Sequence, residues 1–224
     1  MVTLKQRLPR WLPLMALLVA SLAVSGCNYL IFAAYMVGGP PSIEPDFDVE
    51  TGLSMTAKDV TVAVVCYAPT EIRYDFSRID KDLARYVSAR LYQKKIKVVS
   101  PDHINAWVDR NPRWETPAEI GEATGATYVV YLEVSKYSLY EKNSDKLYRG
   151  RSEVLVSVWK MESDGQGEQI YTRDVTTVYP LAVPRSSYDT KYTTFKREFL
   201  ERLSEEIGRL FYEHYNGDDF PDAA

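Results

Sequence analysis

The sequence predicts an α/β sandwich in which helices pack on one mixed β-sheet, and three observations lead to this fold class. Strand-like and helix-like patterns alternate after residue 58. Three alternating segments then follow one another between residues 126 and 180, and an amphipathic helical pattern closes the chain. The predicted order is β-α-β-α-α-β-β-β-α, with strand–helix units in front of a run of antiparallel strands.

The first predicted strand is the apolar segment DVTVAVVCYAP at residues 59–69, whose β-branched run is typical of a strand buried on both faces. We expect Cys66, inside this run, to act as a small hydrophobic residue. Apolar residues at helical spacing predict a helix over residues 75–94. The segment IKVVS, at residues 96–100, is predicted to form a short second strand.

Two further helices are predicted at SPDHINAWVDR, residues 100–110, and at TPAEIGEATG, residues 116–125. Each begins with a hydroxyl residue followed by proline, which is the order typical of an N-cap and a first helical position. In the second helix, Thr116 and Glu119 have the spacing of a capping box, and Gly125 provides the stop signal.

Three alternating segments predict strands at residues 126–140, 146–161 and 169–180. In the first of them, the side chains expected to face the core are Ala126, Tyr128, Val130, Leu132 and Val134. The polar segment ESDGQGE supplies a turn between the second and the third strand. The closing helix, expected over residues 191–215, carries a wide apolar stripe made of Phe195, Phe199, Leu203, Ile207, Leu210 and Phe211.

Residues 1–26 have the composition of a secretory signal peptide. A basic start precedes the mostly apolar run Trp11–Val24, which is 14 residues long. As a helix this run would reach about 21 Å, which is short of the roughly 30 Å hydrocarbon core of a membrane. Small residues and then Cys27 follow, and this junction resembles the bacterial lipobox. The resemblance implies that Cys27 receives lipid, including palmitate, and becomes the N-terminus of the mature chain.

The composition divides the remaining chain into three parts. Residues 27–57 are expected to form a lipid-anchored arm and a tether rich in Gly and Pro. Residues 58–216 are expected to form a single domain, and residues 217–224 a disordered tail. Within the arm, Tyr29–Gly39 is apolar and uncharged, which leaves two placements open: at the membrane interface, or packed on the domain.

The charge of the chain argues against nucleic acid as a partner. The full sequence has a formal net charge of −4. Removal of the signal peptide lowers the Lys and Arg count from 27 to 24 and leaves the 31 acidic residues, so the mature chain lies near −7. A surface of this sign does not attract a polyanion, and no basic cluster with interleaved aromatic residues occurs in the sequence.

No segment of the sequence carries a motif for catalysis or for binding a cofactor. GEATGA lacks the Lys-Ser/Thr pair of a phosphate loop and ends a helix, whereas such a loop begins one. DFDVETG, from Asp46, departs from the calcium-loop pattern because its glycine comes one position late and its twelfth residue is Ala57. The two histidines lie far apart without a metal-ligand pattern beside them. We therefore expect no catalytic residue, no cofactor, no metal and no enzymatic activity.

Four segments together resemble a group of bacterial envelope proteins: VTVAVVCYAP, IKVVS, IGEATGATYVVYLEVSKY and MESDGQGEQIY. They are similar to the superfamily that includes the curli-secretion lipoprotein, the lipoprotein activators of penicillin-binding proteins and the N-terminal domain of the Tol-system propeller protein. The resemblance covers residues 58–215 and implies a non-catalytic periplasmic module that acts through protein contacts on a lipid tether. The chain is too short for the pore hairpins of the curli protein or for a propeller.

The expected function is that of an adaptor or an assembly and regulatory module of the envelope, with a protein partner there. The candidate partner surface is formed by Tyr131, Tyr137 and Leu139, which alternate on the strand face opposite the core stripe. One alternative is a lipid carrier similar to the lipopolysaccharide-assembly lipoprotein, which would need an apolar concavity, and a lesser one is an unrecognised enzyme. Because Asn28 rather than Asp follows the cysteine, the outer membrane is expected over the inner membrane.

Overall fold

The structure, a computed structural model, describes residues 35–36 and 42–215 of the chain. The expected signal peptide, the lipidation site Cys27 and the C-terminal tail lie outside these residues. The chain divides into two units at residue 43, and the domain described below belongs to the second.

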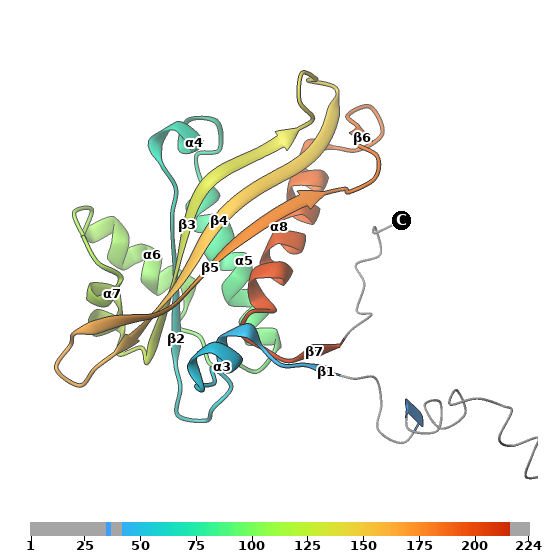
Figure 1. Ribbon diagram of the computed structural model, residues 1–224. Helices are drawn as coiled ribbons and strands as arrows, with labels where there is room; N and C mark the ends of the chain where they lie inside the picture. Colours follow the sequence, from blue (N-terminus) through green and yellow to red (C-terminus); the bar gives the residue numbers. More distant parts are fainter. Residues whose placement is uncertain (1–34, 37–41, 216–224) are drawn as a thin grey trace, which may run out of the picture. The chain divides into compact units, whose positions relative to one another are not determined.

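A mixed β-sheet forms the centre of the domain (Figure 1). Its order is β2 (Val62–Tyr67), β3 (Tyr128–Tyr140), β4 (Leu147–Met161) and β5 (Gly167–Tyr179). The short β6 (Arg185–Ser186) pairs with the start of β4. β2 runs parallel to β3, whereas the β3–β4 and β4–β5 pairs are antiparallel. The predicted fold class, one mixed sheet with helices packed on it, is therefore confirmed.

Helices cover both faces of this sheet. On one face lie α5 (Ile79–Gln93) and α8 (Tyr192–Gly208), whose buried side chains share the larger apolar cluster. On the other face lie α6 (Pro101–Arg110) and α7 (Pro117–Thr124), which cover parts of β2 and β3 with a smaller cluster. β2, buried on both sides as its apolar run predicts, contributes alternate residues to the two clusters.

Several shorter segments complete the domain. α4 (Thr70–Asp75) follows β2 directly and was not expected from the sequence. The segment IKVVS makes only one bridge to β2, between Val62 and Val98, and so does not form the predicted strand. α8 ends at Gly208 rather than near residue 215, and the last described residues form β7 (His214–Tyr215). β1 (Ser42–Ile43) lies, like β7, outside the main sheet.

The predicted capping box of α7 is present. The carboxylate of Glu119 accepts the backbone N–H of Glu115 at 2.8 Å and that of Thr116 at 3.0 Å. These two hydrogen bonds stabilise the ionised form and lower the pKa of Glu119. Gly125 ends the helix in the left-handed conformation, with φ of 62°. Local sequence signals therefore determine both ends of this helix.

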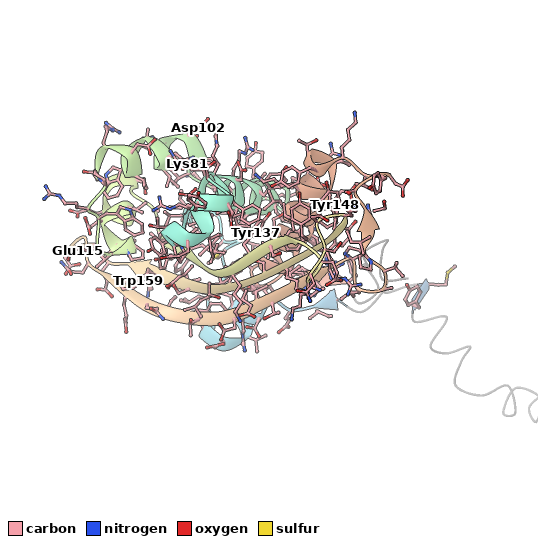
Figure 2. All side chains as sticks on the ribbon, turned by 90° about the horizontal axis from the view of Figure 1, so that it is seen from above. Lys81, Asp102, Glu115, Tyr137, Tyr148 and Trp159 are labelled. Carbon is pink, nitrogen blue, oxygen red and sulfur yellow. The ribbon has the colours of Figure 1, made fainter. Side chains whose placement is uncertain are left out.

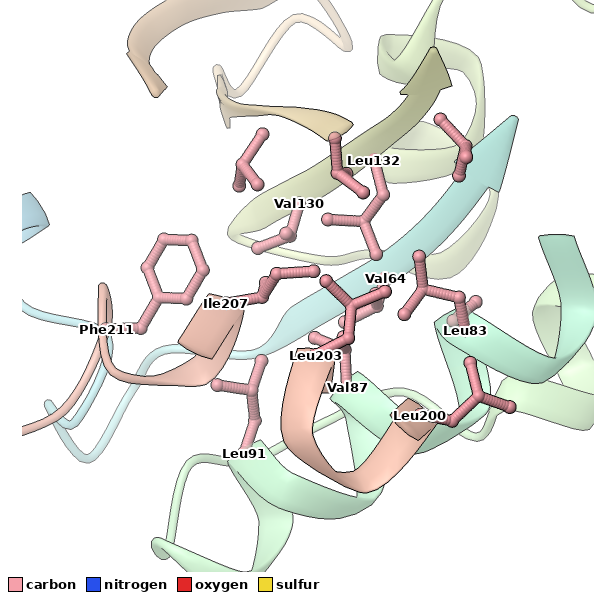
Figure 3. Close-up of a cluster of buried hydrophobic side chains, with 14 of the residues drawn as sticks. Val64, Leu83, Val87, Leu91, Val130, Leu132, Leu200, Leu203, Ile207 and Phe211 are labelled. Carbon is pink, nitrogen blue, oxygen red and sulfur yellow. The ribbon is translucent and has the colours of Figure 1, made fainter. Parts of the chain in front are cut away.

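The larger core lies between the sheet, α5 and α8 (Figure 3). The stripe predicted for the closing helix is buried here, and Phe195, Phe199, Leu203 and Ile207 are inaccessible to solvent. The labelled side chains that meet in this core are Val64, Leu83, Val87, Leu91, Val130, Leu132, Leu200, Leu203, Ile207 and Phe211.

The assignment of residues up to 57 to a tether is wrong for the part that the structure describes from residue 46 onward. The helix α3 (Asp46–Thr51) places Phe47, which is fully buried, in the larger core. Its ring packs edge-on against Tyr128, Tyr171 and Phe211, with centroid distances of 5.8, 5.5 and 5.9 Å. A single aromatic residue in a polar segment has no periodicity, so the sequence pattern did not reveal this packing.

Among the described residues, no helix combines the length and the apolar character needed to cross a membrane.

Candidate interaction surface

The three residues predicted to form a partner surface do not share a face of the sheet. A bulge in β3 between Val134 and Lys136 advances that strand by two residues while the partner strand advances by one. The alternation therefore inverts, and Tyr137 and Leu139 join the face of Val134. Tyr137 is only 8% exposed and Leu139 is fully buried in the larger core, so the prediction of an exposed row is wrong.

Tyr131 lies on the opposite face, in the smaller core. Its ring meets that of Trp114 edge-on at 5.9 Å, and the side chain is partly buried. Burial, followed by the nearby Glu133, raises the pKa of Tyr131 to about 12. Tyr131 therefore packs beneath the α6–α7 side of the domain and not beside Tyr137.

The bulge has a second consequence, because it brings Tyr137 into a pocket of about 610 Å³ at the end of the sheet where β3 turns into β4. Three segments that are distant in the sequence form this pocket: the end of α4, the last part of β3 and the first residue of α8. The lining residues are Asp75, Phe76, Tyr137, Ser138, Tyr140 and Tyr192. We call this the aromatic pocket.

The aromatic rings around the aromatic pocket pack against one another. Phe76 packs edge-on against Tyr137, with centroids 4.8 Å apart. Tyr140 and Tyr192 are nearly parallel, at 26°, with centroids 6.4 Å apart, and Tyr148 contacts both. In Figure 2, Tyr137 lies on the side of the sheet that carries α5. Aromatic pairs of this kind stabilise their own arrangement, so the pocket has a defined shape.

The hydroxyl group of Tyr137 is buried and has no hydrogen-bond partner among the described residues. Burial raises its pKa well above the usual value, and Tyr192, Asp82 and Tyr86 raise it further. Tyr137 is therefore a neutral phenol at any physiological pH. The Asp82 carboxylate near it is held by Lys196, whose Nζ lies 2.8 Å from Oδ2.

Further exposed apolar side chains lie at the same end of the sheet as the aromatic pocket. They come from α4, from the β3–β4 hairpin, from the segments around β6 and from the start of α8, all at the same end of the sheet (Figure 1). We call this set the hairpin-end surface; its members are Tyr74, Tyr140, Leu147, Leu181, Val183, Tyr188 and Tyr192. Tyr74 and Tyr188 are 88% and 79% exposed, so neither ring contributes much to packing within the domain.

Ion pairs hold the hairpin and the β6 segment in place. Glu141 accepts from Arg151 at 2.5 Å and lies 3.1 Å from Arg149, and its pKa is lowered first by the Arg151 hydrogen bond. Arg185, in β6, binds the carboxylate of Glu198 on α8 at 2.6 Å. These ion pairs tie the hairpin to β4 and the β6 segment to α8.

The described residues contain no cluster of three or more His, Cys, Asp or Glu side chains that could hold a metal ion. Cys66 is partly buried, and burial raises the pKa of its thiol well above the usual range. The thiol is therefore protonated at neutral pH, and packing in the core is its role. The described histidines His103 and His214 lie on α6 and in β7, in separate parts of the domain.

No family model matches the chain, and no curated protein matches it. Solved structures that match part of the chain include hypothetical protein CT253 from Chlamydia trachomatis, with 11% sequence identity and a TM-score of 0.41; the match covers 66% of this chain and 95% of that one. Lipoprotein GNA1162 from Neisseria meningitidis has 11% sequence identity and a TM-score of 0.39, and the match covers 66% of this chain and 97% of that one. The PelC dodecamer subunit from Paraburkholderia phytofirmans has 13% sequence identity and a TM-score of 0.38, and the match covers 76% of this chain and 95% of that one. TM-scores below 0.5 carry no argument about function, and the superfamily named from the sequence stays a prediction.

Proposed function

We propose that the protein is a bacterial envelope lipoprotein, anchored by lipid on Cys27, that acts without catalysis by binding another protein through the hairpin-end surface. The anchor follows from the lipobox-like junction at the end of the apolar run. Asn28 after the cysteine favours the outer membrane. The domain would then stand on the periplasmic side of the membrane.

The observation that carries the proposal is the cluster of exposed tyrosines and aliphatic residues on the hairpin-end surface. Tyrosine is enriched in protein interfaces, because its ring buries a large area while its hydroxyl tolerates water before the partner arrives. Single exposed apolar residues are common, but here seven come from four segments at one end of the sheet.

Lipid attachment is tested by metabolic labelling with a palmitate analogue. The wild-type protein should carry the label and sediment with membranes, and Cys27→Ser should lose both. Equal labelling of the variant would contradict the anchor.

Protein binding is tested by cross-linking in the native envelope followed by purification of the lipidated protein and mass spectrometry of both proteins and lipids. Tyr140→Ser should lose a specific protein partner, and the matched control Tyr92→Ser should keep it. Tyr92 serves as the control because it is 73% exposed on α5 and lies outside the hairpin-end surface, whereas Tyr140 is 38% exposed. Thermal unfolding of each variant verifies the fold. A stoichiometric lipid without a protein partner would contradict the proposal and favour the lipid-carrier alternative.

A further inference from the structure

We infer that the aromatic pocket accepts a cationic side chain, arginine or lysine, from the partner protein. This inference rests on the proposed function and specifies the chemistry of the partner at that surface. Four aromatic rings and one carboxylate line the pocket, and no lysine or arginine is among its lining residues. A ligand with both a positive charge and an aliphatic stem matches both kinds of lining.

The rings provide the first part of the recognition. A cation within about 6 Å of an aromatic centroid is attracted by the electrons of the ring, and the attraction grows when water is displaced. Tyr140 and Tyr192 are the exposed rings of the pocket, and Phe76 and Tyr137 form its deeper wall. The guanidinium group of arginine also stacks on aromatic rings, so arginine gains more here than lysine does.

Asp75 provides the second part. It is exposed, lies at the end of α4 and makes no ion pair with any residue that the structure describes. By contrast, the nearby Asp82 is already engaged by Lys196 and by Arg85. Asp75 is therefore the carboxylate that remains available to a cation from outside.

The electrostatic environment of the pocket agrees with this assignment. Among the residues that line the pocket, Asp75 is the one that carries a charge, and that charge is negative. The formal net charge of the mature chain, which lies near −7, adds a longer-range attraction for a basic partner.

The inference is tested with small probes whose charge can be removed without a change of shape. Acetyl-arginine amide is titrated into the full-length protein in detergent, and saturation-transfer NMR reports its binding. Acetyl-citrulline amide, which has nearly the same shape but no charge, is the control. We expect the cationic probe to bind about tenfold more tightly than the neutral one, because it combines a cation–π contact with an ion pair. Acetyl-lysine amide should show a smaller preference over acetyl-norleucine amide.

Two variants locate the effect. Asp75→Asn and Tyr140→Leu should each remove most of the preference for the cation, whereas Tyr92→Leu on α5 should leave it unchanged. Equal binding of the charged and neutral probes, no binding of either, or an undiminished preference in Asp75→Asn would overturn the inference. If the protein partner is still captured from the envelope in any of these cases, the proposed function stands and only the cationic contact is wrong. If Tyr140→Ser loses the protein partner and the wild-type protein binds the cationic probe more tightly than the neutral one, the results support both the proposed function and the cationic contact.

Discussion

Replacement of Phe47 by alanine tests whether the segment before residue 58 is part of the folded domain. The side chain is fully buried and makes three edge-on ring contacts, with Tyr128, Tyr171 and Phe211. Phe→Ala substitutions in cores cost about 3–5 kcal/mol, and three aromatic neighbours place this site toward the upper end. The backbone around it is also held, since the Phe47 N–H donates to the carbonyl of Leu210 at 3.0 Å.

The assay is equilibrium unfolding of the full chain in urea, followed by circular dichroism. For a domain of this size, an m value of about 2 kcal/mol per molar converts a loss of about 4 kcal/mol into a midpoint shift of about 2 M. Val49→Ala is the matched control, because Val49 lies on the same helix and is 67% exposed. Its stability should change by less than about 0.5 kcal/mol. If Phe47→Ala shifts the midpoint no more than the control does, the segment is a tether after all.

Three further predictions concern stability. Leu203→Ala, on the buried stripe of α8, should lower the free energy of unfolding by about 2–5 kcal/mol in the same urea assay, and a silent mutant would mean that this face is not core. Gly150→Ala should cost about 1–3 kcal/mol or more, because the added Cβ would lie 2.4 Å from the ring of Phe199, whereas an unchanged midpoint would show that the ring moves freely. Glu119→Gln should be less stable than wild type at neutral pH. Since the pKa of Glu119 is lowered in the folded state, its contribution is present above the unfolded value near about 4.3 and is lost as the pH falls through the folded one. The two unfolding curves should therefore converge in acid, and a constant gap between them would contradict this origin.

Local signals in the sequence predicted the elements that depend on neighbouring residues. The capping box of Thr116 and Glu119 and the stop at Gly125 define α7 within a few positions, and the spacing of Phe195, Phe199 and Leu203 defines the buried face of α8. Both kinds of signal report on the segment that carries them.

The proposed partner surface was missed because it depends on a bulge and on contacts between distant segments. Strict alternation along β3 predicts Tyr137 on the same face of the sheet as Tyr131. One extra residue before Lys136 moves the side chains in the second half of the strand to the opposite face. The aromatic pocket then joins α4, β3 and α8, which no periodicity within one segment reveals. The highly exposed Tyr74 and Tyr188 were also missed, because neither lies in a periodic pattern that would show whether its side chain faces solvent or the core. Their number in the composition was the only signal in the sequence.

The central claim, that the hairpin-end surface binds another protein, is tested most directly by a photo-cross-linker placed at single positions in the living cell. Benzoylphenylalanine at Tyr188, which is 79% exposed on that surface, is compared with the same group at Tyr92, which is 73% exposed on α5. The account predicts a discrete protein adduct after irradiation at position 188 and none at position 92. The same adduct from both positions, or none from position 188 in cells where the protein is membrane-bound and folded, would contradict it.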